Sequence, residues 1–173
     1  TQFDLSAHFI RSPADLTRTL AIQPEYLKTH GADGVINYSE WSVALGRRFR
    51  ALKLWFLLRA YGLEGLRQMI RNHVAWAQSL AQRLQAVPDI ELVTQPILSL
   101  FTFRFCPAGA NPEAATLDLI TQINNDGRIY LTQTRVDDRF VIRFQAGQFD
   151  CTQADINTAY DVITEIADKI RKG

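Results

Sequence analysis

Residues 41–62, WSVALGRRFRALKLWFLLRAYG, contain a Gly-Arg-Arg turn that leads into a helix unusually rich in aromatic side chains. The large apolar residues of this helix are Phe49, Leu52, Trp55, Phe56, Leu58 and Tyr61. Together they occupy so much of the helix circumference that more than one face must be covered. We therefore expect this helix to be buried or to lie at an interface.

The sequence after this helix predicts an α+β module. Gly62 and Gly65 break the helical pattern, and apolar residues at helical spacing predict a second helix over 64–86, which ends before Pro88. Alternating apolar residues predict strands at 91–93, 98–105, 129–136 and 140–146. Two further helices, beginning at Asn111-Pro112 and Thr152, are predicted over 112–125 and 153–171. We expect antiparallel strands with the helices on one face.

The sequence before residue 41 predicts an arm that precedes this module. Residues 3–9 alternate apolar and polar side chains, which is typical of a strand. Ser12-Pro13 resembles a helix start, so a short helix is expected over 14–20. Residues 22–38 contain proline, glycines and few regularly spaced apolar residues, and they are interpreted as a mobile loop.

Composition excludes several classes of protein. With 173 residues, 47% of them hydrophobic, the chain can bury a sizeable core. The 19 basic and 18 acidic residues nearly balance, so no bulk attraction to nucleic acid or to an anionic membrane is expected. No apolar run reaches the roughly 18–20 residues of a membrane helix, and the first residues lack a signal-peptide pattern. Cys106 and Cys151 lack metal-binding spacing, and a cytoplasmic protein is expected.

Three short motifs carry a resemblance to a known family. They are PEYLK at 24–28, LGRR at 45–48 and RFVIRF at 139–144. With them, the chain from Phe3 to nearly its last residue resembles the C-terminal portion of the aromatic L-amino-acid decarboxylases, which are group II decarboxylases that use pyridoxal 5′-phosphate (PLP). The resemblance implies a fold-type I, aminotransferase-like enzyme that converts DOPA, 5-hydroxytryptophan, tyrosine, tryptophan or phenylalanine to the amine and carbon dioxide.

The resemblance also implies a division of the chain and a set of partners. Residues 1–45 would be the distal segment of the large PLP domain, and 46–173 a helical linker with the small α+β domain. The enzyme would be a homodimer with its active site at the subunit interface. The lysine that binds PLP would lie about four residues before Thr1, in the N-terminal remainder of the enzyme. The chain alone is therefore expected to be inactive.

Tyr26 lies in the polar loop, where a tyrosine has little reason to pack. A phenol can donate a proton in a site from which a closing loop excludes water, although surface packing alone is the common role of such a residue. The resemblance implies that Tyr26 protonates the substrate Cα after carbon dioxide leaves. Relatives that form aldehydes often carry Phe at the matching position, so Tyr26 favours amine formation.

His30 and Gly46 are candidate substrate-binding residues. His30 lies on the same loop as Tyr26 and could orient the phenol or contact substrate, or it could be idle. Gly46 could be a simple turn glycine. The resemblance implies that the turn lines the partner subunit's pocket, where a glycine leaves room for an aromatic ring and argues against histidine as substrate.

Arg143 is the fourth candidate site residue. Its neighbours Val141 and Phe144 are apolar, so it extends from a sheet edge to solvent or points into a polar site. A guanidinium can bind a carboxylate through two hydrogen bonds. The resemblance implies either a contact with the substrate α-carboxylate or a structural contact with the Tyr26 loop, and both remain open.

Two other functions are compatible with parts of the sequence. Residues 47–71 contain many basic side chains and a single acidic one, Glu64. The basic residues are Arg47, Arg48, Arg50, Lys53, Arg59, Arg67 and Arg71. This excess could indicate a nucleic-acid-binding helical hairpin, but the interleaved apolar residues have core spacing. The chain could also be a stand-alone dimerisation module that covers the 49–61 helix by self-association.

Overall fold

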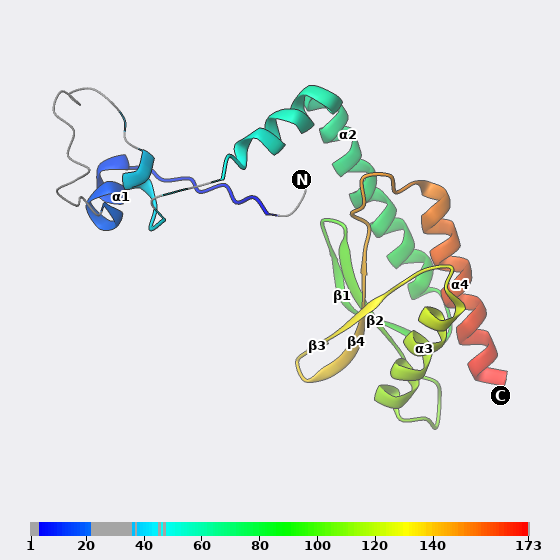
Figure 1. The fold of residues 1–173 in the computed structure, drawn as a ribbon. Helices are drawn as coiled ribbons and strands as arrows, with labels where there is room; N and C mark the ends of the chain where they lie inside the picture. Colours follow the sequence, from blue (N-terminus) through cyan, green and yellow to red (C-terminus); the bar gives the residue numbers. More distant parts are fainter. Residues whose placement is uncertain (1–3, 22–35, 37, 45, 47, 173) are drawn as a thin grey trace. The chain divides into compact units, whose positions relative to one another are not determined.

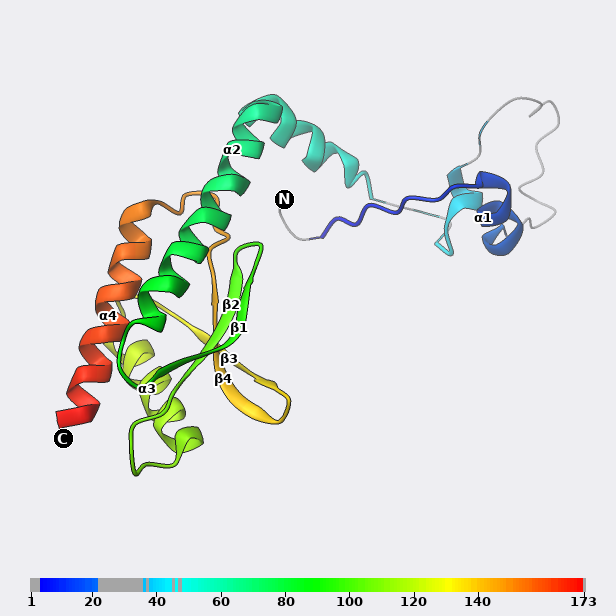
Figure 2. The same cartoon turned by 180° about the vertical axis from the view of Figure 1, so that it is seen from behind.

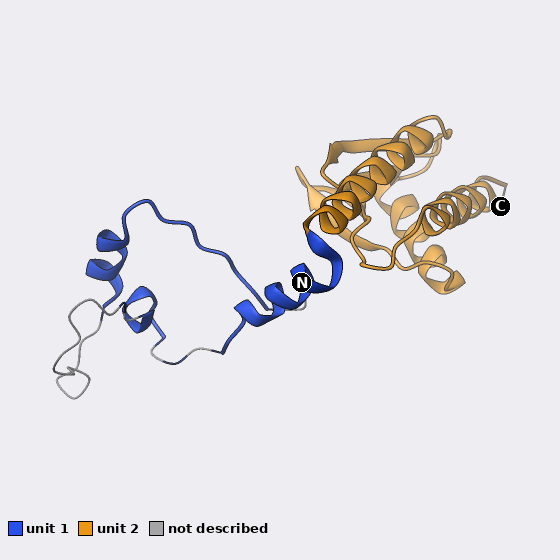
Figure 3. Cartoon of the chain, turned by 90° about the horizontal axis from the view of Figure 1, so that it is seen from above, with its two compact units in different colours: residues 1–62 blue, residues 63–173 orange. Residues whose placement is uncertain are grey.

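Four helices, a short 3-10 helix and four strands are present in the part of the chain that the computed structural model describes, which is residues 4–21, 36, 38–44, 46 and 48–172 (Figure 1). In chain order they are α1 (Pro13–Leu20), η2 (Tyr38–Trp41), α2 (Ala51–Gln85), β1 (Ile90–Ile97), β2 (Leu100–Phe105), α3 (Pro112–Asp126), β3 (Thr132–Val136), β4 (Arg139–Gln145) and α4 (Gln153–Lys172). The chain divides into two compact units, residues 1–62 and 63–173 (Figure 3).

Helix α1 in the first unit confirms the helix predicted over 14–20. Its N-cap is Ser12, whose hydroxyl accepts a hydrogen bond from the Asp15 backbone N–H at 3.4 Å, and Pro13 occupies the first helical position. The strand predicted over residues 3–9 is wrong for the described residues 4–10, which have no regular structure. A strand needs a neighbour for its backbone groups, and Phe9 is instead 91% exposed.

Helix α2 contains a sharp kink at Gly62, where φ is 67° and ψ is 166°. This conformation is almost restricted to glycine, because a Cβ atom would collide with the neighbouring backbone. The predicted break at Gly62 is therefore confirmed. The predicted break at Gly65 is wrong, since Gly65 lies within the regular helix that continues to Gln85.

The second unit contains an antiparallel sheet in the order β1-β2-β4-β3. Helices α3, α4 and the second half of α2 lie on one side of it (Figures 1 and 2). Phe101, Phe103 and Phe105 alternate along β2 and are fully buried against these helices. The helical partners in the core include Leu80, Leu84, Leu119, Ile123, Val162 and Ile163. The predicted α+β architecture is confirmed.

Polar side chains define the ends of the helices in this unit. The Asn111 side chain accepts hydrogen bonds from Glu113 N and Ala114 N at 2.9 and 3.2 Å, which caps α3. Gly127 ends α3 in the left-handed conformation, with φ of 81°. At the start of α4, the Asp155 carboxylate accepts a hydrogen bond from Thr152 N at 2.8 Å. The predicted helix starts at Asn111-Pro112 and Thr152 are therefore confirmed.

Candidate functional site

The face of the sheet that points away from the helices carries a row of polar side chains. Strand register places this row across all four strands, in the order Thr94, Thr102, Arg143 and Thr132. The Thr94 and Thr102 hydroxyls lie 3.0 Å apart, and Thr102 is only 5% exposed. Arg143 thus has a threonine beside it on each neighbouring strand.

Arg143 lies on β4, which is an interior strand of the sheet. The alternative that Arg143 extends from a sheet edge is therefore wrong, because β4 pairs with β2 on one side and β3 on the other. Val141, Arg143 and Gln145 share the face opposite the buried Ile142 and Phe144. Arg143 is half-buried on this face, where its neighbours Val141 and Thr102 are buried.

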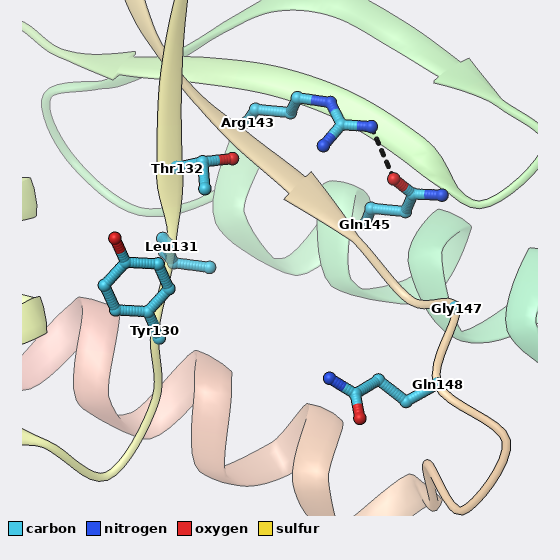
Figure 4. Close-up of a pocket in the computed structure, with 7 residues that line it drawn as sticks. All are labelled: Tyr130, Leu131, Thr132, Arg143, Gln145, Gly147 and Gln148. Carbon is cyan, nitrogen blue, oxygen red and sulfur yellow. Dashed lines mark hydrogen bonds between the residues drawn. The ribbon is translucent and has the colours of Figure 1, made fainter. Parts of the chain in front are cut away.

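A cleft of about 340 Å³ adjoins Arg143 (Figure 4). Its lining comes from the start of β3, the end of β4 and the segment after β4, and consists of Tyr130, Leu131, Thr132, Arg143, Gln145, Gly147 and Gln148. The Arg143 guanidinium donates a hydrogen bond from Nη2 to Gln145 Oε1 at 2.5 Å. Among the described residues that line the cleft, Arg143 is the only charged one, so the cleft favours an anionic group such as a carboxylate.

A second polar cluster lies on the same face near the start of β1. Glu91 accepts hydrogen bonds from Arg139 at 3.2 Å and from the Cys106 thiol at 3.5 Å, and Arg104 Nε donates to the Cys106 sulfur at 3.1 Å. Burial raises the pKa of the Cys106 thiol above its ordinary value, although the Arg104 guanidinium opposes this shift. The thiol therefore stays protonated at neutral pH and is not an activated nucleophile.

The structure places two of the four predicted site residues. Tyr26 and His30 lie outside the described residues. Gly46 belongs to the first unit, is exposed, and a Cβ added there would meet no atom within 4 Å. Local crowding in the described chain thus does not require glycine at this position. Arg143 belongs to the second unit.

Sequence reasoning missed the neighbours of Arg143. Gln145 stands two residues further along the same strand, a spacing that puts both side chains on one face, so this partner could have been found from the strand pattern. Thr132 could not, because it lies opposite Arg143 only through the register of β3 and β4. Tyr130 lies within the strand predicted over 129–136, but β3 begins only at Thr132. Gln148 comes from a segment without a regular pattern.

The described residues do not supply a PLP-binding lysine. The lysines in the described part of the chain are Lys53, Lys169 and Lys172, and none of them lines the cleft. Lys169 pairs with Glu165 at 3.1 Å on the surface. The described cleft offers the Arg143 guanidinium, which can bind a carboxylate. The lysine that binds PLP covalently would have to come from other residues.

Among the described residues, no group of three or more His, Cys, Asp or Glu side chains is placed to hold a metal ion. None of the described helices is both long enough and apolar enough to cross a membrane.

Residues 1–106 match the family model of the pyridoxal-dependent decarboxylase conserved domain. The chain belongs to this family, and the resemblance seen in its motifs is confirmed. The tryptophan decarboxylase TDC1 of Camptotheca acuminata is 34% identical over 175 residues, which cover 98% of this chain and 35% of that protein. The phenylacetaldehyde synthase of Arabidopsis thaliana is 33% identical over 172 residues, which cover 96% of this chain and 35% of that protein.

A solved structure shows the same fold. The Oryza sativa TDC with PLP and tryptamine superimposes with a TM-score of 0.80 at 31% identity, and the match covers 90% of this chain and 34% of that one. The fold-type I assignment made from the sequence is confirmed. The chain spans about a third of the length of the relatives it matches.

Proposed function

We propose that the complete protein is a PLP-dependent decarboxylase that converts an aromatic L-amino acid to its amine and carbon dioxide, and that this chain is its C-terminal portion. The observation that carries the proposal is the similarity to tryptophan decarboxylases across nearly the whole chain. The cleft supports it independently, because a single guanidinium beside neutral polar groups suits an α-carboxylate. PLP, held by residues outside this chain, would accept the electrons released when the carboxylate leaves.

In this proposal Arg143 binds and orients the substrate carboxylate. Carbon dioxide is neutral, so the ion pair with the guanidinium weakens as the bond breaks. Arg143 therefore contributes to substrate binding and alignment more than to the stability of the transition state. We expect Arg143→Ala to raise KM by a larger factor than it lowers kcat.

The other proposed site residues act on the ring and on Cα. Gly46 leaves space for an aromatic side chain in the pocket of the partner subunit, and His30 contacts substrate or orients the phenol. Tyr26 donates its phenolic proton to Cα once carbon dioxide has left. Without this proton donor the decarboxylated substrate is open to oxidation by dioxygen, which gives the aldehyde, ammonia and hydrogen peroxide in place of the amine. This oxidative reaction is the second candidate function.

We also infer that the complete protein is a cytoplasmic homodimer. Several large apolar side chains near the start of α2 are exposed in this chain, and they include Phe49, Trp55, Phe56 and Tyr61. Exposed apolar area of this kind is typical of an interface. The nucleic-acid alternative is disfavoured because Arg50 and Lys53 pair with Asp4, at 3.0 and 3.9 Å.

The test is a product analysis of the complete protein with PLP and each of L-tryptophan, L-tyrosine, L-phenylalanine and L-DOPA. We expect amine and carbon dioxide in equal amounts, and a shift toward aldehyde in Tyr26→Phe. Aldehyde as the main product of the unaltered protein would support the second candidate function. The 173-residue chain alone, given PLP, should release no carbon dioxide, and turnover by that chain would contradict the proposal.

A further inference from the structure

We propose that Gln145 is a positioning residue that holds the Arg143 guanidinium ready for a carboxylate. This inference rests on the proposed function, in which Arg143 binds the substrate α-carboxylate. It adds a residue that lies outside the three motifs of the family resemblance.

Strand pairing fixes the backbone of Arg143 and Gln145. Arg143 is opposite Thr102 on β2 and Thr132 on β3, and Gln145 is opposite Leu100 on β2. Just beyond β4, Ala146 N donates to Ser99 O at 3.1 Å, which continues the ladder past Gln145. The two Cα positions are therefore fixed relative to each other by strand pairing.

Without a partner, the half-buried side chain of Arg143 could adopt several rotamers on this face. An arginine loses much rotamer freedom when it is ordered on a ligand, and this loss weakens binding. The hydrogen bond of 2.5 Å from Arg143 Nη2 to Gln145 Oε1 orders the guanidinium before a ligand arrives. The remaining N–H groups of the guanidinium stay available for a carboxylate.

The amide of Gln145 suits this role because it is neutral. A carboxylate at the same position would form an ion pair with Arg143 and cancel the charge that attracts the substrate. Gln145 accepts the hydrogen bond and leaves the positive charge in place. The row therefore keeps the positive charge of Arg143 between Thr102 and Thr132.

Gly147 leaves space beside the Gln145 side chain. A Cβ atom built on Gly147 would lie 3.5 Å from Gln145 Nε2, 3.7 Å from Cγ and 3.8 Å from Cδ. A side chain at position 147 would therefore lie beside the Gln145 side chain, and glycine leaves that space open next to the cleft (Figure 4).

The experiment compares two competitive inhibitors of the complete PLP-loaded enzyme. One is a 3-arylpropionate, which has the carboxylate and no amine, and the other is an arylethylamine, which has the amine and no carboxylate. Gln145→Met keeps the length of the side chain and removes the acceptor oxygen. We expect it to weaken arylpropionate binding about tenfold and to leave arylethylamine binding within about twofold.

Two further variants define the effect. Gln145→Glu should weaken arylpropionate binding more than Gln145→Met, because it neutralises the guanidinium. Gln133→Ala removes an exposed glutamine of β3 that does not line the cleft and should change neither inhibition constant. In Gln145→Met, KM for the amino acid should rise while kcat stays within about twofold.

The experiment distinguishes two claims, that Arg143 binds the carboxylate and that Gln145 positions Arg143. If Arg143→Ala weakens arylpropionate binding and Gln145→Met does not, the positioning role is wrong and the role of Arg143 stands. If neither variant weakens it, Arg143 does not bind the carboxylate and the inference fails with that role. Equal loss of both inhibitors in Gln145→Met would indicate a general structural defect and would overturn the inference.

Discussion

The Thr116 hydroxyl joins helix α3 to the end of strand β2. The side chain is fully buried, accepts a hydrogen bond from Phe105 N at 3.0 Å and donates to Pro112 O at 2.7 Å. The backbone N–H of Cys106, the next residue, bonds instead to Asp89 O at 2.7 Å on the β1 side. The Phe105 N–H therefore points toward the helix, and the threonine hydroxyl satisfies it inside the core.

Thr116→Val keeps the shape of the side chain and leaves the buried Phe105 N–H without its hydroxyl partner. We expect a loss of about 1–3 kcal/mol in the free energy of unfolding. Thr121→Val is the matched control, since the Thr121 hydroxyl also bonds to a helix carbonyl, Leu117 O at 2.7 Å, but is exposed. The control should change stability by less than about 0.5 kcal/mol. Urea denaturation of both variants checks this, and equal losses would contradict it.

At the scale of an element, α2 is one helix interrupted by a single glycine. Gly62 has a conformation that other residues rarely adopt, and a Cβ atom there would meet nothing within 4 Å. Any loss of stability caused by a larger residue at position 62 therefore comes from backbone strain and not from crowding by neighbouring atoms. Gly65, three residues later, is helical and exposed.

The same substitution at these two glycines should have opposite effects. Gly62→Ala should destabilise the protein by about 1–3 kcal/mol, because alanine resists the positive φ of the kink. Gly65→Ala should stabilise it by about 0.5–1 kcal/mol, because alanine loses less backbone entropy in a helix. Thermal unfolding of both variants measures the difference. A stabilising Gly62→Ala would show that α2 can run straight through residue 62.

At the scale of the whole molecule, an ion network links the end of α3 to α4. Arg128 bonds to Asp126 at 2.6 and 3.0 Å and to Glu165 at 2.7 Å. The hydrogen bond from Arg128 is the main cause of the lowered pKa of Asp126. Hydrogen bonds from Arg128 and, to a smaller extent, from Lys169 lower the pKa of Glu165. Both carboxyl groups are therefore more acidic in the folded chain than in the unfolded chain.

This network makes stability depend on pH in one direction. Because the folded pKa values are lowered, its contribution is complete above the ordinary carboxyl pKa of about 4 and is lost as pH falls through the lowered values. Arg128→Gln should thus lower the free energy of unfolding at pH 7. The difference in this free energy between the variant and the unaltered protein should become smaller below about pH 4. Arg67→Gln, which removes one exposed pair with Glu64, is the control and should show a smaller difference. Urea midpoints across this pH range provide the measurement, and a difference that does not change with pH would contradict it.

Much of the fold was predictable because its elements have strong local patterns. The alternation of Phe101, Phe103 and Phe105 identifies β2, and Asn111 with Pro112 marks the start of α3. The strand predicted over residues 3–9 failed because alternation shows only that one face is apolar, not that a partner strand exists. Gly65 was misjudged because a glycine can break a helix or continue it, and only the backbone angles decide.

The sequence by itself determined the family, the order of most helices and strands, and the nature of Arg143 as a carboxylate-binding candidate. These follow from residue types and from spacings within one element. Only the tertiary structure decided that Arg143 stands on an interior strand and that Thr102 and Thr132 flank it. Strand order and register bring together residues far apart in the chain, and no local pattern specifies which strands become neighbours.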